Sequence, residues 1–206
     1  MKTFLRALIA GLLLIPFSSF SEDVDLFVGT PPTASERPNV LIILDNTANW
    51  NLKFTNEMAA LASVVNTLPV DTFNIGLMLF SETGNGNSNL DGGYLRAAIR
   101  PLTASNKTRY KALVESLDKL GDKGNNGKLS LSMLEAYRYI SGGTVYAGND
   151  KNKADYTGNI SGTAASKAIY DLSGNALNSR NAATYNSPIV SGGCAKNFII
   201  FIKFFI

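Results

Sequence analysis

The chain has 206 residues, with 19 lysine and arginine residues against 16 aspartate and glutamate residues, a net charge of +3. Lys2 and Arg6 both precede an apolar N-terminal segment, so the rest of the chain has 17 basic and 16 acidic residues and a net charge of +1. Because this part has no marked basic excess, we expect no nucleic-acid partner. The chain contains no histidine, the commonest general base and the commonest transition-metal ligand.

The N-terminus has the order of a secretory signal peptide, which we place at residues 1–21. Basic residues come first, an apolar run at 7–17 follows, and small residues then precede Glu22. The apolar run is too short for a permanent helix across a bilayer core of roughly 30 Å. An uncleaved anchor is the alternative, but Pro16 and the serines that follow it favour cleavage. We therefore predict an exported protein with no membrane span after cleavage.

About 185 residues remain after the leader, which is enough for one domain with a hydrophobic core. Residues 22–38 form a polar lead-in with three prolines. Cys194 is the only cysteine of the chain, so its thiol is expected either to have a partner outside this chain or to be buried.

Four apolar segments are predicted strands, at 39–44, 73–80, 94–102 and 197–202. The first and the last are continuously apolar, as in parallel strands buried on both faces. No helical pattern separates the second from the third, so these two should form a hairpin. With helices between the other strands, the order predicts an α/β fold with a doubly wound, mostly parallel sheet and one antiparallel edge strand.

Three helices are expected between the strands. The first spans 51–67, the second begins near Asn106 as its N-cap, and the third ends before Gly142. Residues 141–193 lose this periodicity and are either a functional insertion or partly disordered, apart from a short helix predicted at 163–172. The predicted buried face of the third helix consists of Leu131, Leu134, Ala136, Tyr137 and Ile140.

Polar residues follow the first predicted strand at alternate positions. Asp45, Thr47 and Asn49 supply a carboxylate, a hydroxyl and an amide oxygen, which are ligands suited to Mg²⁺ or Ca²⁺. In doubly wound sheets, ligands bind beyond the carboxyl ends of the strands, where Asp45 is expected. The alternative is that Asp45 and Thr47 only cap the following helix.

The segment Asn39-Val-Leu-Ile-Ile-Leu-Asp-Asn-Thr-Ala-Asn49 resembles the first strand and the Asp-x-Ser-x-Ser turn of von Willebrand factor A domains. The chain is still more similar to the PilY/PilC family of type IV pilus tip adhesins. Further segments resemble that family in the same order, namely Asp23-Val-Asp-Leu-Phe-Val-Gly29, Phe73-Asn-Ile-Gly-Leu-Met-Leu-Phe80, Gly92-Gly-Tyr-Leu-Arg96, Leu134-Glu-Ala-Tyr-Arg-Tyr139 and Cys194-Ala-Lys-Asn-Phe-Ile-Ile200.

This chain departs from the family pattern at the expected metal site. Thr47 and Asn49 stand where the family has serines, and the family's threonine ligand between the second and third helices could be replaced only by Asn125, Asn126 or Ser130. The resemblance thus implies a metal site formed by Asp45, Thr47, Asn49, Asn126 and Ser130. The family's last acidic ligand and its later strands have no counterpart here. We therefore expect 39–206 to be an incomplete von Willebrand factor A-like domain lacking C-terminal strands, in a truncated or frame-shifted chain, with a genuine short product as the alternative.

The resemblance implies a function in type IV pilus assembly, surface adhesion and twitching motility. The protein would be located in the periplasm, on the outer surface or at the pilus tip of a Gram-negative bacterium, with pilus subunits or surface and host proteins as partners. A metal-independent scaffolding domain is the first alternative. An exported hydrolase is the weakest one, since the sequence has no Gly-x-Ser-x-Gly motif, no histidine and no paired carboxylate cluster. We therefore expect the protein not to be an enzyme.

Overall fold

The computed structural model describes residues 33–46, 52–80, 92–117, 122, 128–146, 174–179 and 182–203. Its elements follow the predicted order of a strand, a helix, two strands, two helices and a strand. They are β1 (Asn39–Leu44), α2 (Leu52–Thr67), β2 (Asn74–Leu79), β3 (Tyr94–Pro101), α3 (Ala104–Glu115), α4 (Leu129–Ser141) and β4 (Asn197–Ile202).

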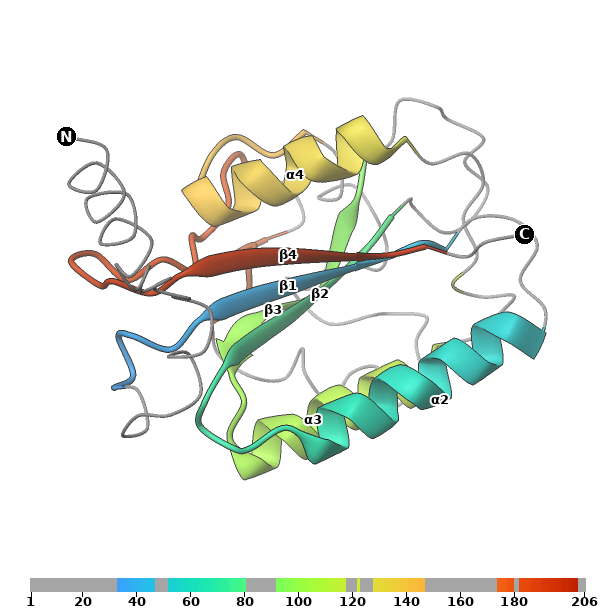
Figure 1. The fold of residues 1–206 in the computed structure, drawn as a ribbon. Coiled ribbons are helices and arrows are strands. Elements are labelled where there is room, and N and C mark those ends of the chain that lie inside the picture. Colours follow the sequence, from blue (N-terminus) through green and yellow to red (C-terminus); the bar gives the residue numbers. More distant parts are fainter. Residues whose placement is uncertain are drawn as a thin grey trace, which may run out of the picture. The chain divides into compact units, whose positions relative to one another are not determined.

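The four strands form one mixed sheet in the order β3-β2-β1-β4 (Figure 1). β1 pairs in parallel with both β2 and β4, whereas β3 pairs antiparallel with β2. The predicted α/β fold, with a mostly parallel sheet and one antiparallel edge strand, is therefore confirmed. Since β1 has a strand on each side, its apolar sequence is explained by its central position in the sheet.

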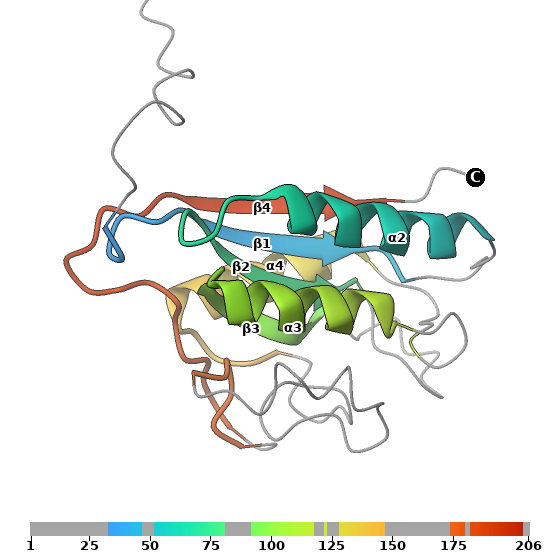
Figure 2. The same ribbon diagram turned by 90° about the horizontal axis from the view of Figure 1, so that it is seen from below.

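Helices cover both faces of the sheet (Figures 1 and 2). Alternate side chains of β1 enter different cores, because successive residues of a strand point to opposite faces. Ile42 and Leu44 pack in the core that also contains Phe54 of α2 and Leu113 of α3. The other core combines Leu41 and Ile43 with Ala136 and Tyr139 of α4.

Asparagines begin three neighbouring parallel strands and form a ladder across them. Asn39 of β1 lies opposite Asn74 of β2 and Asn197 of β4. Its Nδ2 donates to Oδ1 of Asn197 at 2.9 Å, and its own Oδ1 accepts from Nδ2 of Asn74 at 2.8 Å. This ladder fixes the register of all three strands at their amino ends, because a one-residue slip would separate the amides.

The predicted start of α3 is wrong by a few residues, and the predicted end of α4 is confirmed. Thr103, and not Asn106 as predicted, is the N-cap of α3, and its side-chain oxygen accepts from the Asn106 backbone N–H at 3.2 Å. Asn106 lies one turn inside the helix, where its side chain donates to the Pro101 carbonyl at 2.9 Å. Gly142 ends α4 as predicted, with a left-handed φ of 69° that favours glycine.

The predicted buried face of α4 is wrong at two positions. Leu134 and Tyr137 are exposed, whereas Ser132 and Glu135 are fully buried. The two polar side chains face inward because each has partners there. Ser132 Oγ donates to the Phe80 carbonyl at 2.7 Å, and Glu135 Oε1 accepts from the Tyr185 hydroxyl at 2.5 Å. Ala136 is buried, as predicted.

Part of the segment at 141–193 contributes to the core beside α4. Ala176, Leu177 and Tyr185 are buried there, and the Tyr185 ring lies edge-on to Tyr139 at 5.6 Å between centroids. The backbone N–H of Tyr146 also donates to Glu135, at 3.1 Å. One buried carboxyl group therefore accepts hydrogen bonds from both Tyr146 and Tyr185. The short helix predicted at 163–172 lies outside the described residues.

The prediction that the last strand is buried is wrong, because β4 lies at the edge of the sheet and exposes Phe198 and Ile200. Cys194, just before β4, is exposed, which rules out the buried thiol. The predicted leader lies outside the described residues. Among those that are described, no helix has the length and apolar character needed to cross a membrane.

Candidate metal-binding site

Asp45 lies at the carboxyl end of β1, between the ends of its two parallel neighbours. Its backbone N–H donates to the Ile202 carbonyl of β4 at 2.9 Å, and the N–H of Phe80 after β2 donates to the Leu44 carbonyl at 2.8 Å. Asp45 is only 5% exposed. The sequence prediction of its place in the fold is therefore confirmed, and this is the edge where ligands bind in open α/β sheets.

Two helices begin at the same end of the sheet. Figure 1 shows the first turns of α2 and α4 at the end toward which β1 and β4 run. The bond from Ser132, in the first turn of α4, to the Phe80 carbonyl fixes this arrangement. Helix amino ends carry partial positive charge, so they favour ionised carboxylates at this end of the sheet.

Asn46 joins this edge to the loop that precedes α4. Its side chain is fully buried, and Nδ2 donates to the Asp122 carbonyl at 3.0 Å. The Asp122 carboxylate lies 3.5 Å from Nη2 of Arg96 in β3, and both side chains are almost completely buried. Asp122 thus connects Asn46, at the end of β1, to the antiparallel edge strand β3.

Glu57 brings a second carboxylate near Asp45 that was not among the ligands predicted from the sequence. It lies in the second turn of α2, between Phe54 and Met58, which are both buried in the core. Burial, and then the negative charge of Asp45, raise the pKa of the Glu57 carboxyl. Oε2 of Glu57 is buried and has no hydrogen-bond partner among the described residues. The pair can accept a cation, because a positive charge would relieve both the repulsion and the unmet acceptor.

The predicted ligands are described only in part. Thr47, Asn49, Asn125 and Asn126 lie outside the described residues, and Ser130 is exposed in the first turn of α4. Within the described ranges, no group of three or more histidine, cysteine, aspartate or glutamate side chains is placed to hold a metal ion. A cation at Asp45 and Glu57 would therefore need neutral oxygen ligands as well. In the sequence, Glu57 could have been found as the acidic residue of the helix that follows the Asp45 turn.

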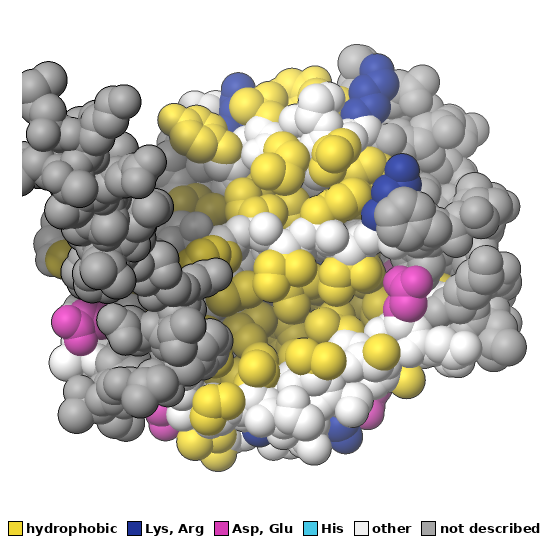
Figure 3. Space-filling model, viewed as in Figure 1, with side chains coloured by type: hydrophobic (Ala, Val, Ile, Leu, Met, Phe, Trp, Pro, Cys, Tyr) yellow, Lys and Arg dark blue, Asp and Glu magenta, His cyan; other side chains and the backbone are white. Residues whose placement is uncertain are grey.

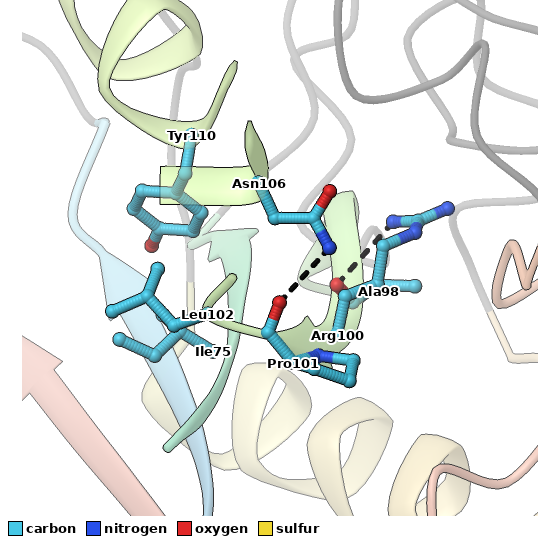
Figure 4. A pocket seen from close by; sticks show the side chains of 7 residues that line it. All are labelled: Ile75, Ala98, Arg100, Pro101, Leu102, Asn106 and Tyr110. Atoms are coloured by element: carbon cyan, nitrogen blue, oxygen red, sulfur yellow. Dashed lines mark hydrogen bonds between the residues drawn. The ribbon is translucent and has the colours of Figure 1, made fainter. Parts of the chain in front are cut away.

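A separate hollow lies between β3 and α3, at the amino half of that helix (Figure 4). Tyr110, Leu102 and Ile75 form its apolar side. The Asn106 amide at its rim donates to the Pro101 carbonyl at 2.9 Å, and Arg100 Nη1 donates to the Ala98 carbonyl at 3.4 Å. Since these polar groups are used within the chain, the hollow suits structural packing better than ligand binding.

In comparisons with known proteins, no family model, no curated protein and no solved structure matches this chain. The resemblance to von Willebrand factor A domains therefore stays a prediction from sequence motifs.

Proposed function

We propose that this protein is an exported adhesion factor that binds a partner through a divalent cation held at Asp45. Following the resembled family, we assign it to type IV pilus assembly and surface attachment. One observation carries the proposal, namely that Asp45 is only 5% exposed at the end of β1, between the ends of the strands on either side. The raised pKa of the Glu57 carboxyl, caused first by burial and then by the charge of Asp45, supports a second carboxylate nearby. Asp45 follows the carboxyl end of β1, which is parallel to β2 and β4, and this is where open α/β sheets bind ligands.

The donor set fits Mg²⁺ or Ca²⁺, which prefer carboxylate, hydroxyl and carbonyl oxygens. Asp45 and Glu57 would supply two negative charges, and Thr47, Asn49, Asn126 and Ser130 are the candidate neutral ligands. A bound cation would supply a Lewis-acidic position for a carboxylate of the partner. The fully buried Asn46, anchored to Asp122, keeps the end of β1 in place beside Asp45.

The proposal is tested by Asp45→Asn in cells, with surface attachment and twitching measured beside the amount of exported protein. Asp71→Asn is the matched control, because it also removes one carboxylate charge but acts on the exposed partner of Arg37. We expect Asp45→Asn to abolish attachment at unchanged protein level and Asp71→Asn to retain it. Normal attachment by Asp45→Asn would contradict the proposal.

A metal-independent scaffold is the second candidate. It is favoured by the apolar side chains that β4 exposes at the sheet edge, since large exposed apolar surface marks contact sites. Normal attachment and twitching in Asp45→Asn, with loss only when apolar surface residues are changed, would establish this alternative.

A further inference from the structure

Two charged side chains are buried together in the described part of the fold. On the face shown in Figure 3, the described lysine, arginine, aspartate and glutamate side chains lie around the margin of an apolar centre. Arg96 and Asp122 are different, because both are almost completely buried, with Nη2 and Oδ1 3.5 Å apart. A buried ion pair contributes little net stability, since both charges lose their water. The stability of the fold therefore does not account for this pair.

Arg96 lies at a bulge in β3. Leu77 and Met78, which are consecutive in β2, pair with Ala97 and Leu95, so Arg96 is the extra residue of β3 at this point. In a regular strand Leu95 and Ala97 would share one face, but here they pack in opposite cores. Bulges redirect side chains and are frequent next to functional sites. The bulge thus changes the direction of the side chains at the position from which Arg96 reaches Asp122.

A chain of contacts connects Arg96 to the end of β1. Asp122 contributes two different groups, since its carboxylate pairs with Arg96 and its backbone carbonyl accepts from Nδ2 of Asn46 at 3.0 Å. Asn46 is fully buried and directly follows Asp45. The side chain of the edge strand β3 is therefore linked, through Asp122, to the residue next to the candidate cation ligand.

We propose that Arg96 is a positioning residue for the cation site and holds Asp45 in place through Asp122 and Asn46. This role rests on the proposed function of Asp45 as a cation ligand. Arg96 itself cannot be a ligand, because a guanidinium is always charged and has no acceptor atom. A lone positive charge near the site would weaken cation binding by repulsion. Since Asp122 balances this charge, the pair fixes the geometry without adding net charge.

The test compares two double variants that each remove an ion pair and keep the net charge of the chain. Arg96→Met/Asp122→Asn removes the buried pair but leaves the backbone carbonyl that Asn46 binds. The matched control is Arg37→Met/Asp71→Asn, which removes a pair at 3.2 Å just before the amino end of β1.

Isothermal titration calorimetry with Mg²⁺ or Ca²⁺ measures cation binding in both variants. We expect the Kd to rise by roughly tenfold or more in Arg96→Met/Asp122→Asn, as is typical when a group that orients a metal ligand is lost. The Kd of Arg37→Met/Asp71→Asn should equal that of the wild type. Because each variant loses one positive and one negative charge, a change in net charge cannot cause the difference.

Hydrogen exchange in the cation-free chain gives a readout that does not depend on metal binding. β1 is bonded to β4 at both ends, from the Asn39 N–H to the Lys196 carbonyl and from the Asp45 N–H to the Ile202 carbonyl. In Arg96→Met/Asp122→Asn, we expect the Asp45 amide to exchange faster relative to the Asn39 amide. A general loss of stability would instead speed up both amides alike.

The two readouts separate this role from the proposed function. If the wild-type chain binds neither cation, the proposed function fails and the exchange ratio alone decides on Arg96. An unchanged ratio in Arg96→Met/Asp122→Asn would overturn the positioning role, as would an unchanged Kd in a chain that binds a cation. If this variant does not fold, Asn46→Ala cuts the same chain of contacts without touching a charge. Faster relative exchange at Asp45 in Asn46→Ala would then support the role, and a wild-type ratio would overturn it.

Discussion

The carboxylate of Asp45, which follows β1, lies close enough to Glu57 in α2 that its charge, together with the larger effect of burial, raises the pKa of Glu57. Such repulsion costs free energy in the folded chain unless a cation compensates for it. The fold maintains the arrangement all the same, since Asp45 is fixed by β4 and Glu57 by the packing of α2.

We predict that Glu57→Gln stabilises the cation-free protein at neutral pH. Because the folded pKa of Glu57 is raised, the stability that its protonated form contributes is present below the ordinary pKa and is lost as pH rises through the folded pKa. The amide avoids this loss, a gain on the order of 0.5 kcal/mol because partial exposure screens the repulsion. Urea unfolding of both proteins between about pH 4 and 7 measures the difference. This range begins near the ordinary pKa of a glutamate carboxyl and extends above it.

Glu115→Gln is the control for this change. Glu115 is an exposed helical glutamate that pairs with Lys111 at 3.2 Å, and surface pairs of this kind contribute little. Its unfolding free energy should therefore change little with pH relative to the wild type. A Glu57→Gln variant that is less stable than the wild type at neutral pH without cation would show that burial and the charge of Asp45 do not destabilise the ionised Glu57 carboxylate.

The asparagine ladder leads to a prediction about the register of the strands. Asn39 bonds to both Asn74 and Asn197, so Asn39→Ala should remove both bonds of the ladder. Asn197→Ala removes one bond of the ladder, at 2.9 Å, and besides it only a long 3.4 Å bond from the exposed Asn197 side chain to the Ala195 carbonyl. At about 1 kcal/mol for each bond, Asn39→Ala should cost about 2 kcal/mol and Asn197→Ala about half of that. Chemical denaturation compares the two, and equal losses would mean that the ladder is not the cause.

Tyr185→Phe tests how the segment after residue 174 is held. The Tyr185 hydroxyl donates to Glu135, a carboxylate that is fully buried. Removing the donor while keeping the ring should cost about 1–3 kcal/mol, because it takes a hydrogen bond from a buried carboxyl oxygen. Hydrogen exchange should show faster exchange of the Tyr146 amide, which donates to the same carboxylate. If the Tyr146 amide exchanges at an unchanged rate, its hydrogen bond to Glu135 does not depend on Tyr185, which would contradict the prediction.

The order of elements could be predicted from the sequence because local patterns determine it. The strand at Asn39–Leu44 is continuously apolar and lies in the middle of the sheet, and Gly142 ends α4 where the pattern ends. The burial of β4 could not be predicted, because a central and an edge strand can have the same apolar sequence. Only the strand order distinguishes the two.

The positions of several polar side chains could not be predicted from the sequence, because they depend on partners from other parts of the fold. Ser132 and Glu135 face inward only because the Phe80 carbonyl and Tyr185 meet them there, which is a tertiary property. Glu57 likewise belongs to the site through the packing of α2 and not through any spacing with Asp45. Alternating oxygen donors in a turn predicted Asp45, but they gave no indication of the second carboxylate.

The most direct test of the cation site is thermal unfolding of the purified chain with and without millimolar Mg²⁺ or Ca²⁺, followed by EDTA. A cation that binds only the folded state must raise the unfolding midpoint. At one hundred times its Kd it adds about 2.7 kcal/mol to the free energy of unfolding. We predict a rise that EDTA reverses, that is lost in Asp45→Asn, weakened in Glu57→Gln and kept in Asp71→Asn. A wild-type midpoint that neither cation changes, or a rise that survives Asp45→Asn, would contradict a divalent cation site at Asp45.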